Sequence, residues 1–280
     1  MVLKKIGFVG QGWGAYSAVK SLLNFFFIEF ISDDEVVTKL IGKNGLKINS
    51  FSDFSADLII IAGYKPIIEK RFTKKFNILN IHYSLLPRYR GLHSIPWAII
   101  NGENKLGWTL HQVNEFIDDG PIIYQKSFLN DQKSSATFYM KKLNYDVENN
   151  LASIIIKYLN KKINPVIQDL SKATWFAKRN QQHNIINFDK GIEYCKRLQR
   201  VLQSPYPDPI IKYNNITFAV TKLAFENRNS LSENSRIINI DSKGVWVGCP
   251  DGYILLIEIK DFEGEEIPYS YFKIGTYINV

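Results

Sequence analysis

Two polar side chains stand together at the end of a β-prone segment, Ile78 to His82. On a strand, residues two apart point to the same side, so Asn80 and His82 present an amide and an imidazole together. An amide can donate hydrogen bonds to an oxyanion, and an imidazole can exchange a proton. The pair is also compatible with a strand end whose polar groups are solvated or bond to local backbone, and both interpretations stay open at this point.

A carboxylate is needed for this pair to do more than bind. Asp118 and Asp119 precede Gly120 in a turn sequence that joins two expected strands, Gly107 to Val113 and Pro121 to Lys126. Acid-acid-glycine is a common turn composition, because Asp bonds to its own backbone and Gly adopts unusual torsion angles. The two acids are therefore either turn formers or partners of the amide and the imidazole.

A glycine-rich turn near the N-terminus is a second candidate ligand site. Gly10, Gly12 and Ala15 match the relaxed dinucleotide fingerprint, since they follow a short apolar segment and precede a helical pattern. Acids lie near the distance of a ribose-binding carboxylate: Glu29, Asp33 and Asp34. A contact to another phosphate-bearing ligand, or a plain tight turn, explains the same residues.

Strands that alternate with helices predict a mainly parallel α/β sheet over about the first 160 residues. The expected strands are Lys5 to Val9, Phe26 to Ile31, Leu58 to Ala62, Ile78 to His82, Gly107 to Val113 and Pro121 to Lys126, and the expected helices are Ala15 to Phe25, Trp97 to Asn101 with Ser94 as a cap, and Ser135 to Leu159. After a loop at 161–187 and a helix at 190–202, short β-prone segments predict a small antiparallel subdomain. We place the domain boundary between residues 187 and 188.

Composition excludes several classes of protein. The 280 residues are 45% hydrophobic, which is enough for a packed core and excludes a disordered chain. The net charge of +8 is scattered along the chain, which favours a small anionic substrate over nucleic acid. Cys195 and Cys249 form no disulfide framework or zinc motif. No apolar stretch approaches the ~20 residues of a membrane span, so we expect a cytoplasmic protein without membrane contact.

Three segments carry a resemblance to a known family: NIHYSLLPRYRG (80–91), NGENKLGWTLHQV (101–113) and IDDGPII (117–123). They resemble the formyltransferases that use 10-formyltetrahydrofolate, which share an Asn, a His and an Asp at this spacing. The resemblance implies that Asn80, His82 and Asp118 are catalytic. It also implies a Rossmann-like α/β formyltransferase domain with a mainly parallel sheet, followed by a small β-rich C-terminal subdomain.

The implied reaction is attack of a neutral amine on the formyl carbon of the folate. Asn80 and His82 would donate hydrogen bonds to the oxygen that becomes negative. Asp118 would orient the His82 ring, favour its protonated form and help to carry the amine proton away. No metal is required, and neither cysteine lies near this constellation in sequence, which favours direct transfer over a covalent formyl-enzyme.

Within the family, the segments Leu92 to Ala98 and Tyr64 to Pro66 resemble the sugar N-formyltransferases. This branch implies a nucleotide-linked amino sugar as acceptor, with dTDP-4-amino-4,6-dideoxyglucose expected, for O-antigen or other surface polysaccharide synthesis. A homodimer is expected, with a contact through the C-terminal subdomain. The alternatives are a methionyl-tRNA formyltransferase and a nicotinamide-dependent Rossmann oxidoreductase.

The resemblance also indicates binding residues. Expected folate contacts are Ser84, Leu85, Leu86, Pro87, Arg88, Gly91 and Ile117. Expected contacts to the sugar nucleotide are Gly12, Trp13, Lys65, Arg90 and His93. Apolar side chains of the 84–91 loop would support the flat pterin, and the cations would meet carboxylate or phosphate groups.

Overall fold

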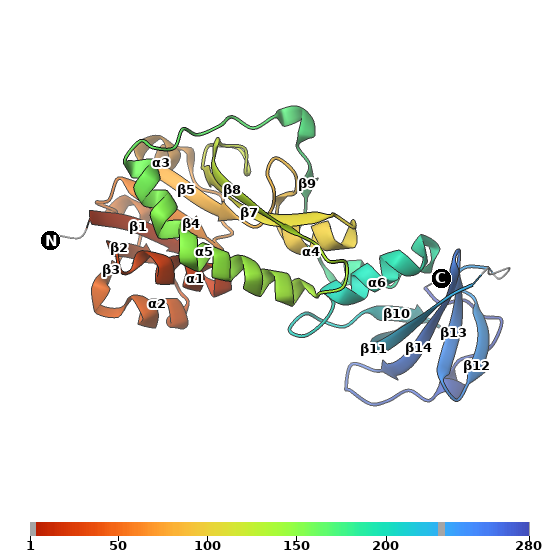
Figure 1. Ribbon diagram of the computed structural model, residues 1–280. Coiled ribbons are helices and arrows are strands. Elements are labelled where there is room, and N and C mark those ends of the chain that lie inside the picture. The colour runs from red at the N-terminus through yellow and green to blue at the C-terminus, as the bar shows by residue number, and fades with distance from the viewer. Residues whose placement is uncertain (1–3, 229–232, 280) are drawn as a thin grey trace. The chain divides into compact units, whose positions relative to one another are not determined.

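The computed structural model describes residues 4–228 and 233–279, which form two compact units (Figure 1). The first comprises 4–95, 105–129 and 138–177, and the second comprises 96–104, 130–137 and 178 onward. The continuous part of the second unit thus begins at Lys178, whereas the sequence analysis places the boundary after residue 187.

A seven-stranded sheet organises the first unit. Its strands, in spatial order, are β3 (Gly45–Lys47), β2 (Phe26–Ile31), β1 (Lys4–Gly10), β4 (Leu58–Ala62), β5 (Asn77–His82), β7 (Lys105–Gln112) and β8 (Ile122–Leu129). The pairs from β3 to β5 are parallel, whereas β5–β7 and β7–β8 are antiparallel. The expectation of a mainly parallel α/β sheet is confirmed.

The helices of the first unit are α1 (Gly12–Leu22), α2 (Glu35–Ile41), α3 (Lys70–Lys75) and nearly all of α5 (Ala136–Leu159), whereas α4 (Ser94–Ile100) begins in the first unit and continues in the second. Helices α1 and α5 pack together (Figure 1), because Ser21 Oγ accepts from the Ala152 N–H at 3.1 Å and Lys20 pairs with Glu148 at 2.7 Å. Ser94 begins α4, and its hydroxyl donates to the Tyr83 carbonyl at 2.7 Å.

The core explains why β4 is a continuous aliphatic run. All five of its residues are buried, as expected of a strand covered on both faces. One apolar cluster joins neighbouring strands and the loops after them: Val9, Ile48, Phe51, Phe54, Ile59, Ile61, Phe72, Phe76 and Ile78. This packing holds the strand ends that carry the polar groups.

The second unit contains helix α6 (Gly191–Val201) and an antiparallel sheet in the order β10 (Ile210–Tyr213), β11 (Ile216–Asn227), β14 (Gly252–Lys260), β13 (Gly244–Cys249) and β12 (Ile237–Asp241). The expected β-rich subdomain is confirmed. Strand β10 was not anticipated, and β11 extends seven residues beyond the predicted end at Val220.

Short elements complete the described chain. Strand β6 (Arg90–Gly91) pairs in parallel with β9 (Trp175–Phe176), which lies inside a segment expected to be a loop. The 3₁₀ helices are Gly42–Asn44, Phe51–Asp53, Leu170–Lys172, Gln181–Asn184, Phe188–Lys190 and Tyr269–Tyr271. Within the described residues, no helix is both long enough and apolar enough to cross a membrane.

Candidate active site

The sheet brings Asn80 and His82 onto the same face of β5 as two residues of β7. Asn80 lies opposite His111, and His82 lies opposite Thr109 in the antiparallel register. Directly opposed residues of an antiparallel pair share a face, so the alternate positions of both strands contribute to one polar group. His111 therefore joins the site.

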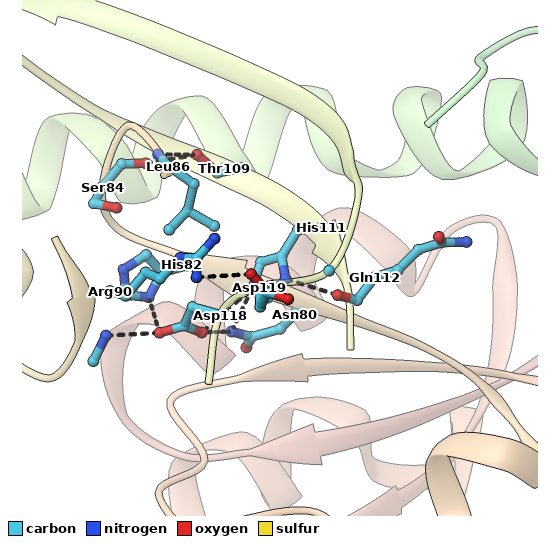
Figure 2. Close-up of polar contacts among 12 residues, drawn as sticks. Asn80, His82, Ser84, Leu86, Arg90, Thr109, His111, Gln112, Asp118 and Asp119 are labelled. Atoms are coloured by element: carbon cyan, nitrogen blue, oxygen red, sulfur yellow. Dashed lines mark hydrogen bonds and ion pairs between the residues drawn. The ribbon is translucent and has the colours of Figure 1, made fainter. Parts of the chain in front are cut away.

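Asp118 lies at the centre of this group (Figure 2). Its Oδ1 lies 3.4 Å from Asn80 Nδ2 and 3.4 Å from His111 Nε2. Its Oδ2 lies 3.5 Å from His82 Nδ1 and accepts the Gly91 N–H at 2.8 Å. The three residues expected to be catalytic thus converge, and their expected roles remain for experiment to test.

Backbone carbonyls orient the two imidazoles. His82 Nε2 lies 2.8 Å from the Tyr89 carbonyl, and His111 Nδ1 lies 2.8 Å from the Gln112 carbonyl. A carbonyl only accepts, so each of these ring nitrogens carries the hydrogen. His111 Nε2 then accepts from Asn80 Nδ2 at 3.1 Å, and this bond orients the Asn80 amide.

Burial governs the protonation of the pair. His82 is 7% exposed, and this burial lowers its pKa below the ordinary value although Asp118 opposes the shift. Burial alone would raise the pKa of Asp118, but the imidazoles of His82 and His111 and the Gly91 N–H together hold it well below its usual range. Asp118 favours the protonated form of His82 as expected, but burial outweighs this effect, so the pKa of His82 lies below its ordinary value and the ring is neutral at neutral pH.

Several residues of the 84–91 loop are buried, although the sequence analysis expected them to contact a ligand. Ser84 and Leu86 are 4% and 3% exposed. Thr109 Oγ1 donates to the Ser84 carbonyl at 2.6 Å and accepts the Leu86 N–H at 3.3 Å. Leu85 is partly exposed and Arg88 is exposed. Pro87 is partly exposed as well, so Leu85, Pro87 and Arg88 are the side chains of this loop that a ligand can reach.

The other expected binding residues differ in their exposure to solvent. Gly12, Trp13, Lys65 and His93 are exposed, and Ile117 is 53% exposed immediately before Asp118. Arg90, expected to meet an anionic ligand, is 2% exposed, and its Nη1 pairs with Asp119 Oδ1 at 2.7 Å. Its guanidinium is thus already neutralised inside the protein.

Cysteines can act as nucleophiles, and His, Cys, Asp and Glu side chains can bind metal ions. Burial raises the pKa of Cys195 to about 12 and that of Cys249 to about 11, so neither forms a thiolate at neutral pH. In residues 4–228 and 233–279, no group of three or more His, Cys, Asp or Glu side chains is placed to hold a metal ion.

Comparisons with known proteins identify the family of this chain. Residues 44–155 match the family described as formyl transferase, and residues 178–275 match formyl transferase, C-terminal domain. A methionyl-tRNA formyltransferase from Clostridium novyi is 30% identical over 222 residues, which cover 78% of this chain and 71% of that protein. The chain therefore belongs to the formyltransferase family, whose members use a formyl-tetrahydrofolate donor.

Solved structures show the same fold. An N-formyltransferase from Helicobacter canadensis, solved with folinic acid and dTDP-3-aminofucose, superposes with a TM-score of 0.69 at 19% identity, covering 95% of this chain and 100% of that one. HypX from Aquifex aeolicus, in complex with tetrahydrofolic acid, superposes with a TM-score of 0.63 at 17% identity over 95% of this chain. This match spans 46% of the HypX chain, about half its length.

Proposed function

We propose that the protein transfers a formyl group from 10-formyltetrahydrofolate to the amine of a nucleotide-linked amino sugar. We propose dTDP-4-amino-4,6-dideoxyglucose as this sugar, for the synthesis of O-antigen or another surface polysaccharide. The supporting observation is the convergence of an amide, a neutral imidazole and a carboxylate at Asn80, His82 and Asp118.

The three residues divide the work of the transfer. The amine nitrogen bonds to the formyl carbon, the bond from that carbon to the folate nitrogen breaks, and the amine loses a proton. With Nε2–H bound by the Tyr89 carbonyl, His82 Nδ1 carries no hydrogen and can accept that proton beside Asp118. Asp118 stabilises the imidazolium that results, and the imidazolium then gives the proton to the departing folate nitrogen, which leaves as the N–H of tetrahydrofolate. The Asn80 amide donates to the formyl oxygen as its negative charge grows.

The residues around Asp118 suit a folate donor. Phe116 and Ile117, immediately before the catalytic carboxylate in the chain, are 64% and 53% exposed. Exposed apolar side chains beside polar groups are typical of pockets that bind flat ring systems. When bound, the donor supplies the activated one-carbon unit, and this chain supplies apolar contact from these residues and from Leu85.

Charge distribution favours a sugar nucleotide over tRNA. The second unit has 14 Lys and Arg against 14 Asp and Glu, so its net charge is zero, and the whole excess of +8 lies in the first unit. A protein that grips a polyanion needs a basic surface that neutralises several phosphates. The likeness to the H. canadensis enzyme, which covers that whole chain, supports the same choice.

Two of the three acids on which the nicotinamide alternative depends, Glu29 and Asp34, are already bound by other groups of the protein. Glu29 accepts from the Ser55 N–H, the Ala56 N–H and the Ser55 hydroxyl inside the protein. Asp34 accepts the Gly12 N–H at 2.7 Å and caps α2, so a carboxylate of the protein already occupies the glycine turn. Calorimetric titration with NAD and NADP should give no binding heat, and a dissociation constant in the micromolar range would restore the oxidoreductase hypothesis.

A direct assay tests the proposed function. The purified protein is mixed with 10-formyltetrahydrofolate and a panel of nucleotide sugars that carry an amine at different ring positions. The expected result is the mass gain of one formyl group on one of them, with release of tetrahydrofolate. Formylation of methionyl-tRNA, with no sugar modified, would overturn the sugar assignment and leave the family chemistry in place.

The expected homodimer stays a prediction. Light scattering coupled to size-exclusion chromatography should give twice the 32.3 kDa chain mass. A mass of one chain at all concentrations would contradict it.

A further inference from the structure

Gln168 lies in the segment that sequence analysis treated as a loop, yet its side chain is buried beneath the catalytic turn. It is 5% exposed. Its Nε2 donates to the carbonyls of Asp118 and Gly120, at 2.8 Å each. Its Oε1 accepts from Arg90 Nη2 at 2.8 Å. Both amide hydrogens of Gln168 are thus used on the backbone of the turn that carries Asp118.

Arg90 connects the Gln168 side chain to Asp119 and to the loop that carries Gly91. Its second guanidinium nitrogen pairs with Asp119 Oδ1 at 2.7 Å, so Arg90 and Gln168 together bind all three residues of the turn. Arg90 also directly precedes Gly91, whose N–H holds the Asp118 carboxylate at 2.8 Å. One buried network therefore fixes both the turn and the backbone group that its carboxylate meets.

The turn needs such a restraint because of its backbone conformation. Asp118 has a φ of 51°, in the left-handed region. This region costs a non-glycine residue roughly 1–2 kcal/mol, and it persists where surrounding contacts hold it. The hydrogen bond from Gln168 to the Asp118 carbonyl stabilises this geometry. Loss of the bond lets the turn relax and moves the carboxylate away from His82.

The segment that supplies Gln168 is itself anchored to the loop beside His82. Strands β6 and β9 pair Arg90 with Trp175, and the Arg90 N–H donates to the Thr174 carbonyl at 2.8 Å. The Tyr89 and Phe176 rings stack with centroids 4.7 Å apart. Because the Tyr89 carbonyl orients His82, the same segment reaches both halves of the His82–Asp118 pair.

We propose that Gln168, acting through Arg90 and Asp119, is a positioning residue that holds the Asp118 carboxylate against His82. This inference rests on the proposed function for its kinetic readout. It reassigns Arg90 from substrate binding to the positioning of a catalytic carboxylate.

The test compares Gln168→Leu with Asp169→Asn, a change at the exposed neighbouring residue that caps a 3₁₀ helix. We expect Gln168→Leu to lower kcat about 10- to 100-fold, since a displacement of roughly 1 Å can cost that much. KM for both substrates should stay close to the wild-type value. The melting temperature should fall, because the change leaves two buried carbonyls and an Arg90 N–H without a partner, while circular dichroism should show that the fold survives. Asp169→Asn should leave kcat unchanged.

A double-mutant cycle separates positioning from general damage. When Gln168→Leu is added to Asp118→Asn, the residual kcat should hardly fall further, because the effects of coupled residues are not additive. The proposal is wrong if Gln168→Leu lowers kcat as much in the Asp118→Asn protein as it does in the wild type. It is also wrong if the folded Gln168→Leu protein keeps the wild-type kcat, or if only its KM is raised. Gln168→Glu provides a second variant in case Gln168→Leu does not fold, because it keeps the Arg90 contact but sets an anionic oxygen against two carbonyls. The same kcat loss is expected.

A measurement without acceptor separates this inference from the proposed function. NMR titration of the His82 imidazole, which faces Asp118 and His111, reports on the carboxylate directly. With Asp118 displaced, the His82 pKa should fall below its wild-type value. A wild-type enzyme that formylates no acceptor would refute the proposed function alone, while an unchanged His82 titration in Gln168→Leu would refute the positioning role.

Discussion

Two loops of the first unit each contain a hydrogen bond from a glycine N–H to an aspartate, but the two bonds serve different purposes. In one, Gly12 has a φ of 75° and its N–H donates to Asp34 at 2.7 Å. In the other, Gly91 has a φ of 94° and its N–H donates to Asp118 at 2.8 Å. Each glycine adopts a conformation that side chains disfavour, and each aims its N–H at an aspartate from another loop.

The surroundings of the two carboxylates differ. Asp34 is partly exposed, and its other oxygen caps α2 through the N–H groups of Val36 and Val37. The Asp118 side chain is 13% exposed and lies against His82, His111 and Asn80. A glycine–aspartate contact is therefore structural where its neighbours are backbone groups. It becomes chemically useful where burial and titratable partners surround the carboxylate.

The sharpest test of this contrast is Asp118→Asn against Asp34→Asn. Each change keeps one oxygen that can accept the glycine N–H, removes the charge and replaces the second oxygen with an amide nitrogen, which only donates. We expect Asp118→Asn to lower kcat about 100- to 10,000-fold, the usual range for an acid–base group. Asp34→Asn should leave kcat unchanged. Equal effects of the two substitutions in steady-state assays would remove the distinction between the loops.

Replacement of Asn80 should have the next largest effect. Asn80→Ala removes the amide donor to the formyl oxygen, and we expect kcat to fall about 100- to 1,000-fold. Circular dichroism should show that the fold survives. Full activity of Asn80→Ala, with His82→Ala also active, would show that transfer does not occur at this site.

The pH dependence should report on His82 rather than on Asp34. The proposed mechanism requires neutral His82, and burial holds the pKa of His82 below the ordinary 6.5. The rate should therefore stay level above that pH and fall as the pH drops through the lowered pKa of His82. Because Asp118 opposes this lowering, Asp118→Asn should move the acid limb to still lower pH. A rate that rises on acidification would show that the imidazolium is the active form.

The smallest effect is expected at the structural loop. Asp34→Ala removes the cap of α2 and the acceptor for Gly12, and loss of such a cap costs about 1 kcal/mol of unfolding free energy. Urea denaturation measures this change, and kcat should remain that of the wild type. A stable Asp34→Ala protein with impaired kcat would place the glycine turn within the active site.

Local pattern was sufficient for most elements of the first unit. The aliphatic run of β4 and the apolar spacing of α5 were predicted within one residue at each end. Helix α2 was missed because seven residues are too few to show a period, and its cap, Asp34, was interpreted as a possible ribose ligand. The two-residue strand β9 was missed because its pairing with β6 depends on residues 85 positions away.

The amino-acid sequence by itself determined that Asn80 and His82 share one side of a strand, because the pleat alternates regardless of context. It also placed Asp118 in a turn. Tertiary structure alone decided that β7 sets His111 beside Asn80, that Arg90 is buried against Asp119, and that Gln168 supports the turn. These outcomes depend on which distant segments pair and which charges become buried, and local periodicity carries no information about either.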